Sequence, residues 1–218
     1  MEQLATLEKN QPSWYSNFTK QSRASSSVER RTENPCVPSS ILGPGTMLTV
    51  VFIIILVLLF TFSYAGLRGA PWVPTKNNDM ARFLRLANIQ PGEKMYDLGC
   101  GDGRMVCAAG SAGAQAKGFE VSVFPFLIAK LRRLLQKNKK NISIAFRDFW
   151  FINLRDADVV YVFLMPKIYE RLEEKFKKEL RPGARVITYV WPLEAWQPQE
   201  ISEEKGFPKM YSYIVPQH

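Results

Sequence analysis

The pattern of apolar positions divides the chain into one long hydrophobic stretch and a following region of shorter runs. Residues 47–65, MLTVVFIIILVLLFTFSYA, carry no charge and have about the length that spans a bilayer as a helix. No face of such a helix would be polar, which argues against a helix of a soluble domain. We therefore predict one transmembrane helix here. A cleaved signal peptide is the alternative, although the following SYAGLRGA segment is a poor cleavage site.

The region from residue 78 onward alternates short apolar runs with amphipathic stretches, which is typical of an α/β domain. The expected helices are Asn78–Ala87, a helix that begins with Arg104–Ala109, Pro125–Gln136 and Lys167–Leu180. The expected strands are Met95–Leu98, Ala116–Glu120, Asn141–Arg147, Ala157–Leu164 and Ala184–Val190. This alternation predicts a Rossmann-like, mostly parallel sheet with helices on both faces.

Apolar spacing also predicts which helix faces are buried and how the domain ends. In the last helix the buried stripe is expected at Ile168, Leu172, Phe176 and Leu180. In the helix before it, the expected buried side consists of Phe126, Leu127, Leu131, Leu134 and Leu135. Beyond Val190, two tryptophans and nearby prolines leave little room for another helix. We therefore expect an abbreviated C-terminal end in which Met210–Val215 adds an edge strand.

The remaining segments complete a four-part organisation of the chain. Residues 1–46 are rich in polar residues and lack apolar periodicity, so we expect them to be disordered. The hydrophobic helix at 47–65 is followed by a short, stiff linker at 66–77 that contains two prolines. The methyl-transfer domain argued for below then covers residues 78–218. Because the hydrophobic run begins at Met47, one hypothesis is that this methionine is the true start.

The distribution of charge predicts an orientation for the span. The net charge of +9, from 29 basic and 20 acidic residues, favours an anionic partner such as a membrane surface. More Lys and Arg residues lie close after the span than before it, which predicts a single-pass protein with its C-terminal domain on the cytoplasmic or matrix side. Basic residues near the end of helix Pro125–Gln136 form either a solvated face or a contact with anionic lipid. No nucleic acid is expected as a partner, because aromatic residues are not interleaved with them.

Histidine and cysteine chemistry has little support in this chain. The single histidine is the last residue, His218, and the three cysteines are scattered along the sequence. These features exclude histidine triads and argue against a disulfide framework or a metal site. Cys100, which lies within a glycine turn, is expected to be a small packing residue.

The most informative stretch is Lys94–Arg104, KMYDLGCGDGR, which is typical of a strand, a glycine turn and the start of a helix. Its spacing departs from the dinucleotide pattern, because Arg104 stands where a third glycine is expected. Asp97 and Asp102 would repel a pyrophosphate but suit a ligand with a cationic centre. S-adenosylmethionine, with a sulfonium, an α-amino group and a ribose, is such a ligand. Glu120 after the next strand fits an acid that binds ribose hydroxyls.

On these residues the chain resembles the class I S-adenosylmethionine-dependent methyltransferases. YDLGCGDGR is similar to their first motif, and LRPGARVI at 180–187 looks like their turn into strand five. The resemblance implies that Asp148 hydrogen-bonds the adenine amino group and that Phe149 lies against the ring. A helix cap or turn is the other interpretation of Asp148. The expected cofactor-binding residues of this motif set are Asp97, Gly99, Cys100, Gly101, Asp102, Gly103, Glu120, Asp148 and Phe149.

PWVPT at 71–75 is similar to a segment of the membrane-anchored protein-lysine N-methyltransferases of the mitochondrial inner membrane and their prokaryotic relatives. The resemblance implies that Thr75 helps to close the methionine end of the cofactor site. A rigid linker with an interfacial tryptophan is the alternative interpretation. A slot for the acceptor is expected after the fourth strand, because ligands bind at the carboxyl ends of such strands. Its candidate residues are Trp72, Trp150, Met165 and Pro166, with Tyr161, Phe163 and Trp191 as further walls.

The expected function is therefore a membrane-tethered, S-adenosylmethionine-dependent methyltransferase that acts on lysine side chains of a membrane-associated protein. No residue is nominated as a catalytic base. Three alternatives stay open: a methyltransferase acting on a lipid, quinone or other small molecule at the membrane surface, a non-catalytic binder of S-adenosylmethionine, and a dehydrogenase with a degenerate turn. The loop after the fourth strand lacks Asn-Pro-Pro-Tyr, which argues against methylation of amides or adenine amines.

Overall fold

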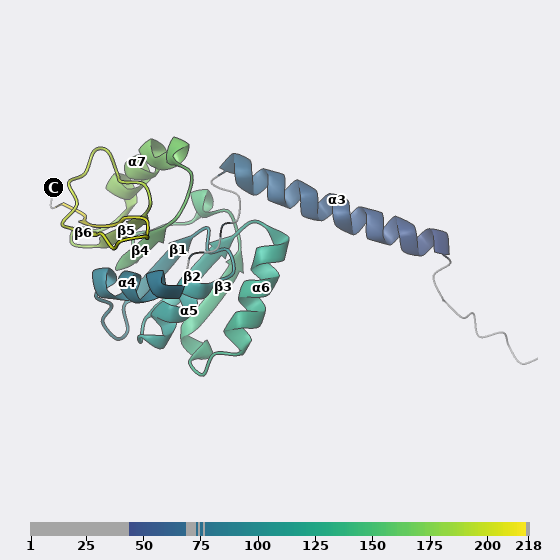
Figure 1. Cartoon of the computed structure of the whole chain (residues 1–218), viewed down its shortest axis with the longest axis horizontal. Helices are drawn as coiled ribbons and strands as arrows, with labels where there is room; N and C mark the ends of the chain where they lie inside the picture. The colour runs from purple at the N-terminus through teal and green to yellow at the C-terminus, as the bar shows by residue number, and fades with distance from the viewer. Residues whose placement is uncertain (1–43, 69–72, 74, 76, 217–218) are drawn as a thin grey trace, which may run out of the picture. The chain divides into compact units, whose positions relative to one another are not determined.

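The computed structural model describes residues 44–68, 73, 75 and 77–216, whose helices and strands are drawn in Figure 1. Most of the segment predicted to be disordered lies outside these residues, so that prediction stays untested. Trp72, a candidate for the acceptor slot, also lies outside the described residues.

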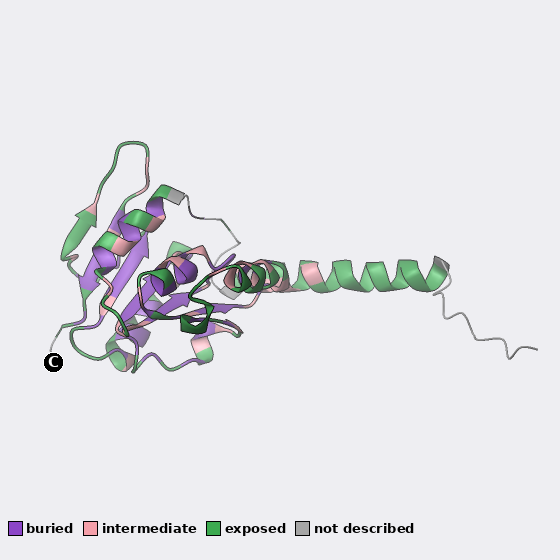
Figure 2. Ribbon diagram, turned by 90° about the horizontal axis from the view of Figure 1, so that it is seen from below, coloured by how far each residue is buried: buried purple, intermediate pink, exposed green. Residues whose placement is uncertain are grey.

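Helix α3 (Pro44–Arg68) contains the predicted span and extends beyond it at both ends, into the first residues of the predicted linker. Within it, Gly45–Tyr64 is 20 residues long, has a mean hydropathy of 2.7 and is not buried. Figure 2 shows this exposure along most of the helix. The hydroxyls of Thr49 and Thr61 donate to carbonyl oxygens one turn earlier, which satisfies them inside the helix. By length and composition, α3 is therefore a candidate for crossing a membrane.

The α/β domain is built on a seven-stranded sheet of order β3-β2-β1-β4-β5-β7-β6. Neighbouring strands are parallel except around β7, which runs antiparallel to both β5 and β6. The chain moves outward in one direction from β1 and in the other from β4, so their carboxyl ends form the topological switch point. The strands are β1 (Lys94–Leu98), β2 (Gln115–Glu120), β3 (Ile142–Phe146), β4 (Val159–Val162), β5 (Arg185–Tyr189), β6 (Glu200–Ser202) and β7 (Met210–Ile214).

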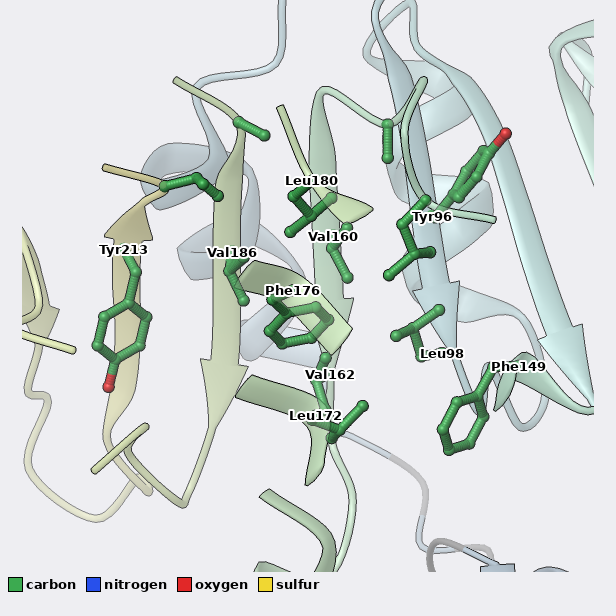
Figure 3. Close-up of a cluster of buried hydrophobic side chains, with 14 of the residues drawn as sticks. Tyr96, Leu98, Phe149, Val160, Val162, Leu172, Phe176, Leu180, Val186 and Tyr213 are labelled. Atoms are coloured by element: carbon green, nitrogen blue, oxygen red, sulfur yellow. The ribbon is translucent and has the colours of Figure 1, made fainter. Parts of the chain in front are cut away.

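Helices cover both faces of the sheet, as predicted. Successive strand residues point to opposite faces, which produces two separate cores. Figure 3 shows the core on the α7 side, where Leu172 and Phe176 pack with Leu98 and Val160 of the sheet. Helices α4, α5 and α6 pack on the other face. The helices are α4 (Asn77–Ala87), α5 (Arg104–Ser111), α6 (Val123–Leu134) and α7 (Tyr169–Glu179), with 3-10 turns η1 (Lys139–Asn141), η2 (Phe149–Phe151) and η3 (Pro166–Ile168).

A buried ion pair fixes α4 against the C-terminal strands. Arg82 Nη1 lies 2.7 Å from Asp79 Oδ1, and both side chains are almost inaccessible. The Tyr189 hydroxyl donates to the other Asp79 oxygen at 2.7 Å, and Arg82 Nη2 donates to the carbonyl of Ser202 at 2.6 Å. These partners satisfy charges that would otherwise be costly to bury. The network therefore holds α4 beside β5 and β6.

The predicted buried side of α6 was wrong. Its contact with the rest of the domain is made by Pro125 and Ala129. A Cβ on Gly103 would lie only 2.9 Å from the Ala129 Cβ, so small residues let this helix approach the glycine turn. The large side chains that were expected inside are instead exposed, namely Leu127, Leu131, Leu134 and Leu135.

The end of the sheet also differs from the prediction. The strand at Met210–Ile214 is present, but β6 (Glu200–Ser202) pairs outside it and takes the edge position. A three-residue strand with charged and polar side chains carries no apolar alternation from which it could be predicted. Between β5 and β6 the described residues form no helix, so the C-terminal end is abbreviated as expected.

Candidate active site

The carboxyl ends of β1 and β2 hold the glycine turn at the switch point. Gly99, Gly101 and Gly103 have φ angles of 87°, 53° and 73°, a left-handed conformation that glycine adopts without a Cβ clash. The main-chain N–H groups of Gly99 and Cys100 both donate to the carbonyl of Phe119, at 3.0 and 2.9 Å. The turn is therefore fastened to the end of β2, and α5 begins directly after it.

Gly118 allows this close approach, and the sequence interpretation did not include it. A Cβ on Gly118 would lie 2.6 Å from Cys100 Sγ and 2.7 Å from Val106 Cγ2. Cys100 is buried in this contact, which confirms that it is a small packing residue. The available signal was a glycine inside a predicted strand, because such glycines often mark a close approach of two backbones.

Glu120 lies at the end of β2, where it was predicted, and main-chain groups orient its carboxylate. Oε2 accepts a hydrogen bond from the Gly101 N–H at 2.8 Å, while Oε1 accepts from Val121 and Ser122 at 2.9 and 2.8 Å. A carboxylate oxygen can accept two hydrogen bonds, so Oε2 keeps a lone pair for another donor. The side chain can therefore receive a ribose hydroxyl without losing the bonds that hold it.

Asp97, near the end of β1, is the buried carboxylate of the site. Burial, and then the charges of Glu120 and Asp102, raise its pKa well above the ordinary value. A cationic group beside this carboxylate would lower the pKa and stabilise the charged form. The α-amino group of S-adenosylmethionine is a cation of the required kind.

Asp102 does not offer a second unpaired carboxylate, in contrast to the expectation for the turn. Its Oδ2 lies 2.7 Å from Arg104 Nη2 and 2.8 Å from Arg132 Nη2. Burial by itself would raise the pKa of Asp102, but the two arginines bring it below the ordinary value. Both arginines were missed as site-supporting residues, because spacing alone does not show which charges meet. Asp97 is left as the carboxylate suited to the cationic end of the ligand.

Thr75 reaches the glycine turn through Arg104. A guanidinium nitrogen of Arg104 donates to the main-chain carbonyl of Thr75, while the same side chain holds Asp102. Thr75 is buried, whereas Val73 two residues earlier is exposed. The PWVPT segment is thus tied to the turn at its last residue. That Thr75 closes the methionine end of the cofactor site stays a prediction.

Tyr161 of β4 lies beside Asp97 of β1, because these residues are register partners on adjacent parallel strands. Its hydroxyl is buried and makes no hydrogen bond with the described residues, although the Thr75 side chain is close enough to influence its pKa. Burial, and then the charge of Asp97, raise the pKa of Tyr161 well above its ordinary value. The hydroxyl is therefore protonated at neutral pH and is a buried donor without an acceptor, which favours a ligand at this position.

The residues predicted to surround adenine follow β3. Asp148 caps η2, and its Oδ1 accepts a hydrogen bond from the Trp150 N–H at 2.9 Å. The Phe149 ring is buried in the α7-side core, as Figure 3 shows, and lies 5.0 Å from the Trp150 ring. The cap interpretation of Asp148 is thus confirmed, and contact of either side chain with adenine stays a prediction.

The predicted acceptor slot has exposed walls at the carboxyl edge of the sheet. Met165 and Pro166 begin η3 after β4, and Met165 is 41% exposed. Trp191 after β5 is 42% exposed. The Trp150 ring is covered by the Arg171 guanidinium, 4.1 Å from the ring centroid. Apolar side chains at this edge can take up the methylene stem of a lysine, but their roles stay predictions.

The sheet order, the glycine turn and the acid at the end of β2 define a class I S-adenosylmethionine-dependent methyltransferase. The residues fit this cofactor, since Asp97 calls for a cation, Glu120 keeps an acceptor site and Tyr161 has an unused donor.

Comparisons with known proteins give the finer class. The ANTKMT methyltransferase domain matches residues 97–200. A protein-lysine N-methyltransferase of Saccharolobus islandicus is 31% identical over 153 residues, which cover 68% of this chain and 95% of that protein. The adenine nucleotide translocase lysine N-methyltransferase of Mus musculus is 36% identical over 175 residues, which cover 78% and 75%. The structure of an RNA methyltransferase from Salinibacter ruber with S-adenosyl-L-homocysteine has a TM-score of 0.64 and 26% identity, covering 67% of this chain and 95% of that chain.

This chain belongs to the protein-lysine N-methyltransferase family. It is an enzyme that uses S-adenosylmethionine as its methyl donor.

Proposed function

We propose that α3 holds this enzyme at a membrane and that it methylates lysine side chains of a membrane-associated protein. The observation that carries the anchoring is the exposure of α3, whose residues Gly45–Tyr64 have a mean hydropathy of 2.7 and no buried share. A bilayer core accommodates such a helix, whereas water does not. The excess of Lys and Arg after the helix supports a domain on the cytoplasmic or matrix side.

The relatives and the linker length support a membrane-associated substrate. One relative is named for lysine methylation of adenine nucleotide translocase, and others are named for lysine methylation of a component of ATP synthase. In this chain the segment between Arg68 and Asn77 spans at most about 30 Å when fully extended. The domain therefore stays near the surface from which α3 emerges. An acceptor lysine on a membrane protein lies within its reach.

The proposed mechanism assigns binding roles to the buried carboxylates and positioning to the edge of β4. When bound, S-adenosylmethionine supplies a sulfonium methyl group for in-line displacement. Asp97 receives the α-amino group, and Glu120 accepts from the ribose. Met165 and Trp191 line the approach of the acceptor, which must lose a proton first at a cost of about 4–5 kcal/mol at pH 7. Desolvation against these side chains lowers the pKa of the lysine and reduces that cost.

The substrate class is tested with labelled S-adenosylmethionine. The full chain is added to solubilised membranes, and protein and lipid are then separated and counted. Label on lysine in a protein band supports the proposal, whereas label confined to the lipid extract overturns it in favour of a lipid or quinone acceptor. Asp97→Asn should abolish transfer. Asp156→Asn is the matched control, because Asp156 pairs with Lys94 at the other end of β1.

Anchoring is tested separately by alkaline extraction of membranes that contain the full chain. Retention in the membrane pellet is expected for a spanning helix. Release into the supernatant would show that α3 does not insert, and the tethering would then be wrong whatever the substrate.

A further inference from the structure

Helix α6 presents an apolar face to solvent, on the side opposite its contact with the domain. The face consists of Phe124, Leu127, Leu131, Leu134 and the capping residue Leu135, which are between 55% and 77% exposed. We call these five residues the outward face of α6. Their spacing of three to four residues places them on one side of the helix. Figure 1 shows α6 beside β3, the strand at the edge of the sheet.

The position of this face follows from the inward contacts of α6. Ala129 meets Gly103 of the glycine turn, as described above. Arg132 donates to Asp102, and Arg133 donates to the carbonyl of Ile142. These inward bonds fix the rotation of the helix about its axis, so the large apolar residues cannot turn inward. Apolar side chains gathered on an exposed surface mark an interaction site.

The charge around the outward face is entirely positive. Between Glu120 and Asp148 the sequence contains no acidic residue and seven basic ones. Two of the seven are the inward arginines. Lys130 lies over the Phe126 ring, with its Nζ 5.4 Å from the centroid, so its stem follows the apolar surface while its charge stays outside. The exposed basic side chains of this region include Lys130, Lys137, Lys139 and Lys140.

We propose that the outward face of α6 lies on an anionic lipid bilayer. An apolar face fringed by lysines is the arrangement that inserts at the boundary between headgroups and acyl chains. The apolar side chains enter that boundary, and the lysines meet lipid phosphates. This inference rests on the membrane anchoring proposed for α3, because the short linker keeps the domain at the surface where the lipid is.

The apolar surface continues toward the site. Phe146, at the carboxyl end of β3, is half exposed, and its ring packs edge-on against Phe126 at 5.3 Å. The glycine turn and Glu120 lie at the same edge of the sheet, because parallel strands end together. Docking along α6 would therefore hold the cofactor site at the level of the membrane surface and fix its orientation toward lysines there.

Charge argues against a second copy of the chain on this face. A symmetric dimer through α6 would bring two sets of lysines together across the contact. Without acidic residues between 120 and 148 to pair with them, those like charges would repel. Lipid phosphates supply the complementary charge.

The test measures the depth of single side chains in vesicles that contain the full chain. With Cys36 replaced by Ser, a fluorophore is attached at Leu131→Cys; Cys100 and Cys107 are buried and so are protected from the reagent. Two further positions are labelled in separate proteins: Phe52→Cys in α3, and Glu170→Cys on the exposed side of α7 as the matched control. The vesicles carry brominated acyl chains, which quench nearby fluorophores, in phosphatidylcholine with or without phosphatidylglycerol.

The proposal expects quenching at positions 52 and 131 but not at 170, and stronger quenching at 131 when phosphatidylglycerol is present. Changing Lys130, Lys137 and Lys139 to Glu should remove that increase. Quenching at 52 without quenching at 131 would overturn the docking while anchoring stands. Absence of quenching at both would overturn anchoring and docking together. Shielding of 131 by cross-linking between copies, without quenching, would replace lipid by a dimer and contradict the proposal.

Discussion

Arg132 of α6 and Asp102 of the glycine turn are joined by two hydrogen bonds. Nε donates to the Asp102 carbonyl at 2.9 Å, and Nη2 donates to Oδ2 at 2.8 Å. Arg104 holds the same carboxylate from the other side. The turn that shapes the cofactor site is thus supported by the helix that follows it and by α6.

Replacing Arg132 with Gln should loosen this support. Removing a partner of a buried carboxylate costs about 1–3 kcal/mol, and the partial exposure of Arg132 favours the lower end. We expect the affinity for S-adenosylhomocysteine to fall about fivefold or more, as measured by calorimetry. Lys178→Gln, an exposed change on α7, is the control and should bind normally. Unchanged affinity in Arg132→Gln would show that the pair does not shape the site.

Asp97→Asn should separate cofactor binding from stability. The change removes the anion for the α-amino group, so we expect at least a hundredfold loss of affinity. The cofactor-free variant should be as stable as the wild type or more so, because burial penalises the charged carboxylate. Binding close to that of the wild type would refute the role of this residue.

The pH dependence of the cofactor-free protein follows from the same shift. A carboxyl whose pKa is raised by folding favours the folded state below its unfolded pKa of about 4, and that contribution is lost as pH rises through the raised pKa. The unfolding free energy of the wild type should therefore decrease over that range relative to Asp97→Asn. Denaturant titrations at several pH values provide the comparison, and parallel curves would be inconsistent with a raised pKa.

Tyr161→Phe removes the buried hydroxyl that has no partner among the described residues. If this hydroxyl donates to the cofactor, the affinity should fall about fivefold, which corresponds to one hydrogen bond of about 1 kcal/mol. Thermal stability without cofactor should be equal or higher, because an unsatisfied buried group is lost. A purely structural role would leave affinity unchanged.

Gly118→Ala tests the close approach of β2 to the glycine turn. The new Cβ would lie 2.6 Å from Cys100 Sγ, and relief of this overlap should cost about 1–3 kcal/mol of unfolding free energy. Gly183→Ala is the comparison, since that position has a positive φ but nothing within 4 Å of the added Cβ. Chemical denaturation should show the larger loss in Gly118→Ala. Equal losses would mean that the turn yields easily.

Local patterns allowed much of the fold and cofactor site to be predicted. The buried runs around Asp97 and Tyr161 gave adjacent parallel strands, and the glycine turn gave the position of Glu120 at the switch point. These features follow from chain-local chemistry, namely turn conformation and strand burial. The role of PWVPT depended on resemblance, and the structure describes its last residue at the turn through Arg104.

The missed features depend on contacts between distant residues. The outward face of α6 could not be predicted, because the helix has apolar residues on several sides and Ala129 decides which side packs. The pairing of Asp102 with Arg132 depends on the same packing. The buried Asp79–Arg82 pair has the spacing of an ordinary surface pair, and only the carbonyl of Ser202 and the hydroxyl of Tyr189 reveal its burial.

The most direct measurement is the site-resolved detection of a transferred methyl group. The full chain and its Asp97→Asn variant are incubated with native membranes and S-adenosylmethionine that carries a deuterated methyl group, and membrane-protein peptides are analysed by mass spectrometry. The account predicts deuterated methyl-lysine with the wild type and none with the variant. Deuterium found only in extracted lipid, or at residues other than lysine, would contradict it.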